Sequence, residues 1–376
     1  MTRICWRSDG EFFAINFFET LSNSRKFQVY TREGLLHSTI EDKINILDSP
    51  ISWKYSKSSL IATSVYRFNK HEIVFFERNG LTHGSFVLPF KFCQMKVNQI
   101  SWNLDSTLLC IWAESIESNK NLNSQYTSVI QIWYTSNCHW YLKQTYNFDA
   151  EDKISVVSWD SEDSLILHTI TVTGRYLKYN FGWTINLSNC IENYNGSIAV
   201  IDGESILLTP FRKKSIPPPM CHLKVNCTKA VNKIIWSPQN LDLLVHSFDD
   251  NLLYFKCNDV EGNAYELIGM SKLEIKNKSI FLQHILWISP LEVLTISIDS
   301  TNSSSVASYS IEITDSQDKK NVSFIKRNAF SIKDPVYNAV FNSKSNTLLL
   351  VSLYQQNSSL EAEGSLYVDT CEAVGS

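Results

Sequence analysis

The chain has 376 residues, of which 44% are hydrophobic and 19% charged, and its formal net charge at pH 7 is −4. This supply of apolar side chains suffices for a core and excludes a chain that is disordered throughout. The small negative charge argues against a protein that is coated with positive charge for binding nucleic acid.

Aromatic residues make up 12% of the chain, whereas glycine and proline number only 12 and 9. Aromatic enrichment favours β-strands, and scarce glycine disfavours loops that wrap phosphates. No apolar run reaches the roughly 20 residues of a membrane helix, and the first residues lack a secretory signal. The nine cysteines are scattered singly, which predicts reduced thiols. We therefore expect a location in the cytoplasm, and also the nucleus, without membrane association.

One pattern recurs from the first residues onward. An alternating apolar segment ends in an aromatic residue, four to six polar or turn residues follow, and a second apolar run comes next. The aromatic residues, called the marker residues below, recur every 47 to 57 residues except for one interval of 77. In chain order they are Trp6, Trp53, Trp102, Trp159, Trp236, Trp287 and, in a weaker copy, Phe341.

Further alternating runs follow the first two in most units. A third run lies at 26–30, 72–77, 128–134, 251–256 and 305–311, and a fourth, more polar run lies for example at 140–148. Four short antiparallel strands in ~40–50 residues are typical of a β-propeller blade. In a blade, the marker residue lies on the strand nearest the axis and packs between neighbouring blades. Strands of an ordinary β-sandwich are the alternative.

The interval of 77 residues separates Trp159 from Trp236 and contains an eighth unit without a marker residue. Its segment 197–211 predicts a hairpin in which Ile198–Ile201 pairs with Ile206–Thr209 around Asp202 and Gly203. The sequence therefore predicts an all-β protein of about eight four-stranded WD40-like β-propeller blades.

Both chain ends look cut within this architecture, because the first unit begins at residue 3 and the last ends near 365–369. Eight units can form one ring or parts of two rings. The polar stretch 149–153 and the prolines at 217–219 are the two candidate seams, since a proline run cannot donate strand hydrogen bonds.

Residues for catalysis or metal binding are not evident. Cys221, His222 and Cys227 form the one candidate metal cluster, but structural zinc needs four closely spaced ligands. No nucleotide-binding or nucleophile motif occurs. Asp9, Asp105 and Asp163 follow marker residues in turns, where an Asp side chain bonds the local backbone. We therefore predict a non-enzymatic chain with no catalytic residue, metal or cofactor.

Two surface features remain open. The first is the basic run Arg212, Lys213 and Lys214, which indicates a solvated loop in the first place and, as the alternative, a contact for a partner or for nucleic-acid phosphates. The aromatic residues on 133–134 and 140–141 could stack nucleic-acid bases, but their alternating positions favour packing within a blade. These four are Trp133, Tyr134, Trp140 and Tyr141.

Several long segments resemble one known family, the largest subunit of the Elongator complex (the IKAP family). They are RSDGEFFAI (7–15), IVFFERNGLTHGSFVLPF (73–90), CHWYLKQTYNF (138–148) and AVIDGESILLTPFRKKSIPPPMC (199–221). The resemblance is collinear over residues 3–257 and is strongest at 199–221.

This resemblance implies the later blades of a first WD40-type propeller (1–145) and the earlier blades of a second (146–376), with an alternative seam near 215. It implies a non-catalytic scaffold whose complex modifies the wobble uridine of tRNA through a separate radical-SAM and acetyltransferase subunit. The implied partners are that catalytic subunit and a second propeller-bearing subunit, with tRNA met only through the complex. The family's dimerisation region lies outside the resemblance. A propeller scaffold of another assembly and a propeller hydrolase with two channel carboxylates are the alternatives.

Overall fold

The computed structural model describes residues 2–40, 46–55, 60–90, 95–116, 127–183, 196–259, 264–273, 281–299, 303–316, 319–342, 345, 347–353 and 364–369. By their contacts, the residues form two compact units, unit 1 (Met1–Thr184) and unit 2 (Ile185–Ser376). Across the described ranges, the regular structure is strand apart from one 3-10 turn, η2 (Ala150–Asp152). None of it is a helix long and apolar enough to cross a membrane.

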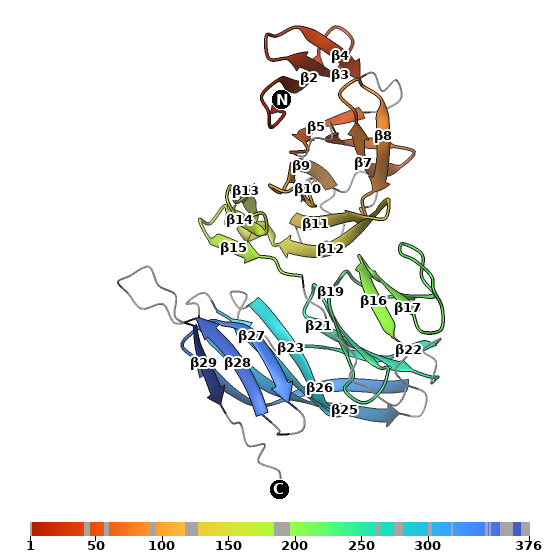
Figure 1. Ribbon diagram of the computed structural model, residues 1–376, viewed down its shortest axis with the longest axis vertical. Helices are drawn as coiled ribbons and strands as arrows, with labels where there is room; N and C mark the ends of the chain where they lie inside the picture. Colours follow the sequence, from red (N-terminus) through yellow and green to blue (C-terminus); the bar gives the residue numbers. More distant parts are fainter. Residues whose placement is uncertain are drawn as a thin grey trace. The chain divides into compact units, whose positions relative to one another are not determined.

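Unit 1 contains four antiparallel sheets whose neighbouring strands are consecutive in the chain (Figure 1). The first three sheets have four strands, and the last has three. The strands are β1 (Arg3–Trp6), β2 (Phe12–Glu19), β3 (Ser24–Thr31) and β4 (Leu36–Ile40); β5 (Ile46–Trp53), β6 (Ile61–Arg67), β7 (Lys70–Phe76) and β8 (Thr82–Val87); β9 (Met95–Trp102), β10 (Leu108–Ser115), β11 (Ser128–Ser136) and β12 (His139–Phe148); and β13 (Ile154–Trp159), β14 (Ile166–Thr171) and β15 (Tyr176–Asn180).

Unit 2 repeats this arrangement (Figure 1). Its second and third sheets have four strands, and its first and last have three. The strands are β16 (Ser197–Asp202), β17 (Ser205–Pro210) and β18 (Leu223–Asn226); β19 (Val231–Trp236), β20 (Leu243–Ser247), β21 (Asn251–Cys257) and β22 (Tyr265–Lys272); β23 (Phe281–Ser289), β24 (Glu292–Ile298), β25 (Ser304–Ser316) and β26 (Lys319–Ile332); and β27 (Val336–Asn342), β28 (Thr347–Leu353) and β29 (Gly364–Asp369).

Eight consecutive up-and-down sheets confirm the all-β, blade-like prediction. Five of these sheets have the four strands of a blade, and three have three strands in the described chain. The sheet of β16 to β18 is limited to three strands by chain length. After β18 ends at Asn226, β19 starts at Val231, and the four residues between them leave no room for another strand.

The hairpin predicted near 200 forms as expected. Ile198 pairs with Thr209 and Ile201 with Ile206 in antiparallel register. The turn lies one residue later than predicted, because Asp202 still pairs with Ser205. Gly203 adopts a φ of 61°, a left-handed conformation that glycine tolerates at low cost.

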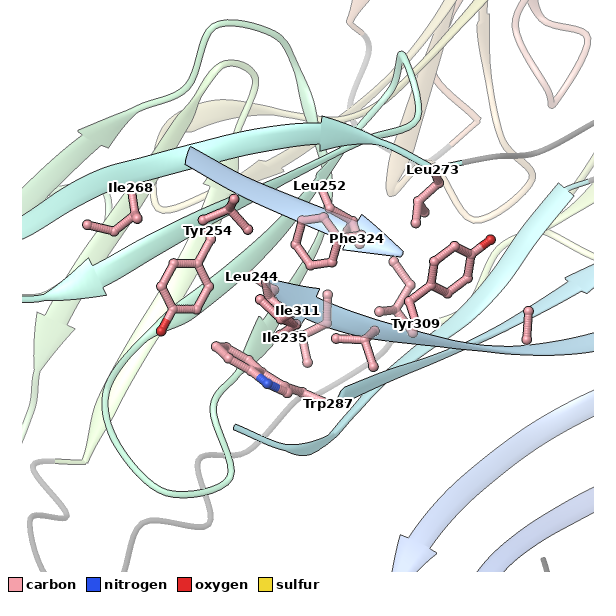
Figure 2. Close-up of a cluster of buried hydrophobic side chains, with 14 residues drawn as sticks. Ile235, Leu244, Leu252, Tyr254, Ile268, Leu273, Trp287, Tyr309, Ile311 and Phe324 are labelled. Atoms are coloured by element: carbon pink, nitrogen blue, oxygen red, sulfur yellow. The ribbon is translucent and has the colours of Figure 1, made fainter. Parts of the chain in front are cut away.

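The hydrophobic cores lie between successive sheets. Figure 2 shows the cluster between the sheets β19 to β22 and β23 to β26. There the Trp287 and Tyr254 rings meet edge to face, with centroids 5.6 Å apart. Strand alternation explains this layout, because one face of each strand points to the preceding sheet and the other to the following sheet.

Packing is continuous across the position where the sequence places a seam, near residue 145. Ile130 and Phe148 of one sheet share a cluster with Ile154 and Val157 of the next. The division between the two compact units falls later, after Thr184. The seam near 145, as a boundary between two rings, stays a prediction.

Candidate interaction surface

Most marker residues pack against the preceding sheet. Trp102, for example, shares a cluster with Ile73 and Phe75 of the sheet before it. Trp159 and Phe341 are partly buried in the same arrangement. The buried marker residues are Trp53, Trp102, Trp236 and Trp287.

Trp6 is the exception, and the expectation that it is buried is wrong, because 52% of it is exposed. It lies on β1, and no described sheet precedes β1 to supply a packing surface. The neighbouring Cys5 points to the opposite face and packs in the core shared with the next sheet. The Trp6 ring rests against Phe13 of its own sheet, at a centroid distance of 4.8 Å.

A second regular position lies three residues before the marker residue on the inner strand. Gln99, Lys233 and His284 each extend toward the next sheet and donate to a backbone carbonyl there. Gln99 Nε2 lies 2.9 Å from Val157 O, and His284 Nε2 lies 3.1 Å from Tyr337 O. Lys233 Nζ donates to Gln283 O. These side chains join inner strands of successive sheets, and the sequence analysis missed them because the polar residue types differ.

Two inner strands of unit 2, β19 and β23, carry ionisable groups at this position. Burial lowers the pKa of Lys233 to about 8. Burial also lowers the pKa of His284, and the positive charge of Lys233 lowers it further. Both groups are therefore shifted toward their neutral forms at the contact between successive sheets.

The turn carboxylates bond the local chain, as their position after the marker residues predicts. Asp9 forms an ion pair with Arg7 at 2.5 Å, and this contact lowers the pKa of Asp9. Asp105 accepts hydrogen bonds from Thr107, and Asp163 Oδ1 accepts one from Leu165 N at 2.9 Å. These local contacts explain why Asp occurs at the three positions, and no catalytic role is needed for that explanation.

One polar group escaped the sequence analysis. His168 on β14 lies between Asp160 and Tyr176, with Nε2 2.9 Å from Asp160 Oδ2 and Nδ1 2.6 Å from the Tyr176 hydroxyl. The antiparallel registers of β13 to β15 bring the three together, and no sequence motif announces that register. Backbone N–H groups of the turn, together with His168, hold the pKa of Asp160 well below its usual range.

The aromatic residues near 140 pack within the unit. Trp133 and Tyr141 are buried. The Trp140 ring stacks on Phe75 with centroids 4.9 Å apart. Tyr134 meets Trp183 edge to face at 4.9 Å. This arrangement favours blade packing over an open platform for nucleic-acid bases.

The basic run lies in the exposed turn that follows β17. Arg212, Lys213 and Lys214 all reach the surface, and Lys214 Nζ lies 3.0 Å from His222 Nε2. Of the cysteines in the candidate metal cluster, Cys227 is buried, and burial raises the pKa of its thiol to about 12. Since a metal is bound by the thiolate, this cysteine is poorly suited as a ligand. Among the described residues, no three His, Cys, Asp or Glu side chains gather into a possible metal site.

Two family models match the chain one after the other. The model described as the ELP1 first N-terminal beta-propeller matches residues 1–162. The model described as the ELP1 N-terminal second beta-propeller matches residues 200–367. Their order along the chain is that of the first and second propellers.

Curated relatives agree with these matches. A putative elongator complex protein 1 of Xenopus laevis is 40% identical over 234 residues, 62% of this chain and 19% of the relative. Elongator complex protein 1 of Mus musculus is 38% identical over 260 residues, 68% of this chain and 19% of the relative. That of Schizosaccharomyces pombe is 32% identical over 310 residues, 81% of this chain and 22% of the relative. The chain thus spans about a fifth of these relatives, and the matches confirm the resemblance of the quoted segments.

Proposed function

Since the chain belongs to the Elongator complex protein 1 family and holds blades of its two N-terminal propellers, we propose that it acts as a non-catalytic scaffold segment of an Elongator complex. Its work is to bind other subunits, so that the assembly can modify the wobble uridine of tRNA. The proposed partners are a second propeller-bearing subunit and the catalytic radical-SAM and acetyltransferase subunit, in the cytoplasm and the nucleus.

The consecutive match of two propeller models over most of the chain carries this proposal. A single propeller match would fit many intracellular assemblies, because propellers host many functions. Two in the order of one family, with relatives at 32–40% identity, favour an Elongator subunit over the alternatives.

The packing of the sheets suits a binding role. Buried marker residues fill the space between successive sheets, and inner-strand side chains such as Gln99 and His284 join them. Such packing makes a rigid support, on which loops and sheet faces can hold partners in fixed positions. The three turn carboxylates considered for a propeller hydrolase, Asp9, Asp105 and Asp163, make local turn contacts instead.

A chimera tests this proposal. In cells that lack their own Elongator complex protein 1, we would express the Schizosaccharomyces pombe relative with its matching segment replaced by this chain. Wobble-uridine modification would be measured by mass spectrometry of tRNA nucleosides. We expect modification with the chimera, none with the relative deleted for that segment, and none with this chain alone.

Two outcomes would contradict the proposal. If this chain alone restored the modification, the chain would be sufficient for the activity and would not be a segment that supports other parts of the complex. A stable chimera that co-purifies with no Elongator subunit would remove the scaffold role.

A further inference from the structure

In unit 1, two of the turns that join the second and third strands of a sheet carry exposed apolar tips. Among the described residues, Leu21 and Phe68 are the most exposed large apolar side chains, at 97% and 79%. Leu21 lies in the turn between β2 and β3, and Phe68 lies in the equivalent turn between β6 and β7. A single exposed apolar side chain is common on protein surfaces, but two at equivalent turns of successive sheets form a regular feature.

Both tips project from the same edge of the sheets. Equivalent turns of successive sheets contact each other: Ser8 Oγ, after β1, donates to Tyr55 O, after β5, at 3.0 Å. Asn103 Nδ2, after β9, likewise donates to Ser164 O, after β13, at 3.0 Å. Successive sheets therefore have the same orientation. Because antiparallel strands reverse direction at each turn, the turns after β2 and β6 emerge together on the opposite edge.

Phe68 adopts a backbone conformation that aromatic residues rarely take. Arg67 pairs with Lys70, so the turn contains only Phe68 and Asn69, and both have positive φ values, 51° and 59°. Two-residue turns of this kind favour Asn, Asp or Gly at the first position, because these residues adopt the left-handed conformation at low cost. Here the first position holds a bulky aromatic residue, and its ring gains little burial in return.

The chain contains the ordinary form of the same turn between β11 and β12. There Ser136 pairs with His139, and Asn137 and Cys138 have φ values of 51° and 59°. Asn occupies the first position, as this type of turn favours. A sheet of this fold thus forms such a turn without an aromatic residue, and the ring of Phe68 calls for a reason other than folding.

The charges near the two tips are largely balanced within unit 1. Glu19 pairs with Lys26, and Arg67 pairs with Glu72, each at 2.7 Å. Lys70, directly after the turn between β6 and β7, is exposed. An anionic lipid surface attracts clusters of Lys and Arg, so these balanced pairs argue against it. A protein pocket with a carboxylate at its rim matches an aromatic tip that is followed by one lysine.

We propose that Phe68 is an anchor that inserts into an apolar pocket of a partner protein, where Lys70 meets a carboxylate at the pocket rim. Leu21 adds a second apolar contact from the neighbouring sheet. Aromatic side chains are enriched in the centre of protein interfaces, and a few such residues supply most of the binding free energy. A two-residue turn holds the ring in place before binding, which lowers the entropy cost. This inference goes beyond the scaffold proposal and holds whichever complex the chain serves.

Urea unfolding of the full chain tests whether Phe68 serves binding or folding. Phe68→Asn should raise the urea midpoint above that of the wild-type chain, because Asn suits the turn and little buried contact is lost. Asn137→Phe is the matched control, since it places Phe at the first position of the other two-residue turn, and it should lower the midpoint. A lower midpoint for Phe68→Asn would show that the ring stabilises the fold, and the proposal would fall.

Photocrosslinking identifies the occupant. In the tagged 376-residue chain, p-benzoylphenylalanine replaces Phe68, or Asn137 as the control, in cells that contain the full-length family member. We expect one protein to be crosslinked from position 68 and not from position 137, through a peptide that lines an apolar pocket with Asp or Glu at its rim. In purified form, this protein should bind the wild-type chain about tenfold more tightly than it binds Phe68→Asn or Lys70→Glu.

Three further results would overturn the proposal. The absence of a crosslink specific to position 68 would show that the ring binds no protein. A crosslink to the full-length family member, or to a second copy of this chain, would show that the ring packs against its own kind. Sedimentation of the chain with phosphatidylserine vesicles that Phe68→Asn abolishes would show a lipid contact. A specific crosslink to the pocket of a protein from another assembly would support the anchor and contradict the Elongator scaffold proposal.

Discussion

At the scale of single residues, two positions on the inner strands β9, β19 and β23 have different tasks. On these strands the marker residue faces the preceding sheet, and the residue three places earlier reaches the following one. The sequence predicts the first position well, because aromatic rings at a regular spacing stand out. It predicts the second poorly, because Gln99, Lys233 and His284 share only the ability to donate a hydrogen bond. The exposure of Trp6 was not predictable either, since burial depends on a neighbouring sheet.

The different surroundings of two marker residues predict different costs of truncation. Trp102 is 1% exposed and contacts Phe75 and Trp140, whereas Trp6 is 52% exposed. Trp102→Ala should lower the free energy of unfolding by about 3–5 kcal/mol, because a cavity remains in the core. Trp6→Ala should lower it by less than about 1.5 kcal/mol, because little buried contact is lost. Urea unfolding measures both, and equal losses would show that the marker residues do not act through burial.

Lys233 predicts a pH dependence in unit 2. Its pKa in the folded chain is about 8, against about 10.4 in an unfolded chain. Between these values the unfolded chain binds more protons, so the free energy of unfolding should rise with pH and be lower below pH 8. Relative to Lys233→Met, the wild-type chain should gain on the order of 1–3 kcal/mol between pH 8 and pH 10.

Lys272→Met is the control for this measurement, since Lys272 is an exposed lysine of the same unit. Its stability should run parallel to that of the wild-type chain over the same pH range. Parallel curves for Lys233→Met as well would mean that the Lys233 ammonium is hydrated in the folded chain.

At the scale of elements, alternation and turn residues predicted strands and their order, including the hairpin of β16 and β17. The number of strands per sheet was less predictable. It depends on the number of residues between one strand and the next. Between β18 and β19 there are only four residues, and the loop at 211–222 contains no strand. The sequence also has no pattern that predicts where outer strands of successive sheets approach each other closely. Gly269 on β22 lies at such a close approach.

Gly269 predicts a clash upon substitution. A Cβ at this position would lie 2.7 Å from Val322 N and 3.2 Å from Val322 Cβ of β26, so backbone atoms would have to move. Gly269→Ala should therefore lower the free energy of unfolding by about 1–3 kcal/mol. Gly84→Ala on the outer strand β8 meets no atom within 4 Å and should cost less than about 0.5 kcal/mol. Urea unfolding that ranks Gly84→Ala as the costlier change would refute the close contact of β22 and β26.

At the scale of the whole molecule, the repeat predicted the fold class, and the resemblance predicted the family. The division into two compact units was less predictable. It depends on which residues contact each other in space, whereas the repeating sequence pattern of the blades continues without a break across the division. The candidate surface was predictable only as a basic run at 212–214.

Affinity purification tests the central claim, a propeller scaffold segment of an Elongator complex, most directly. The tagged chain would be expressed in cells that also contain the full-length family member, and quantitative mass spectrometry would identify what binds. The matched control is the same chain carrying Trp102→Ala and Trp287→Ala, which removes two buried marker residues. We predict that the second propeller-bearing subunit and the catalytic subunit are enriched with the wild-type chain and lost with the control. A folded wild-type chain that enriches neither subunit, or enriches subunits of another assembly, would contradict the claim.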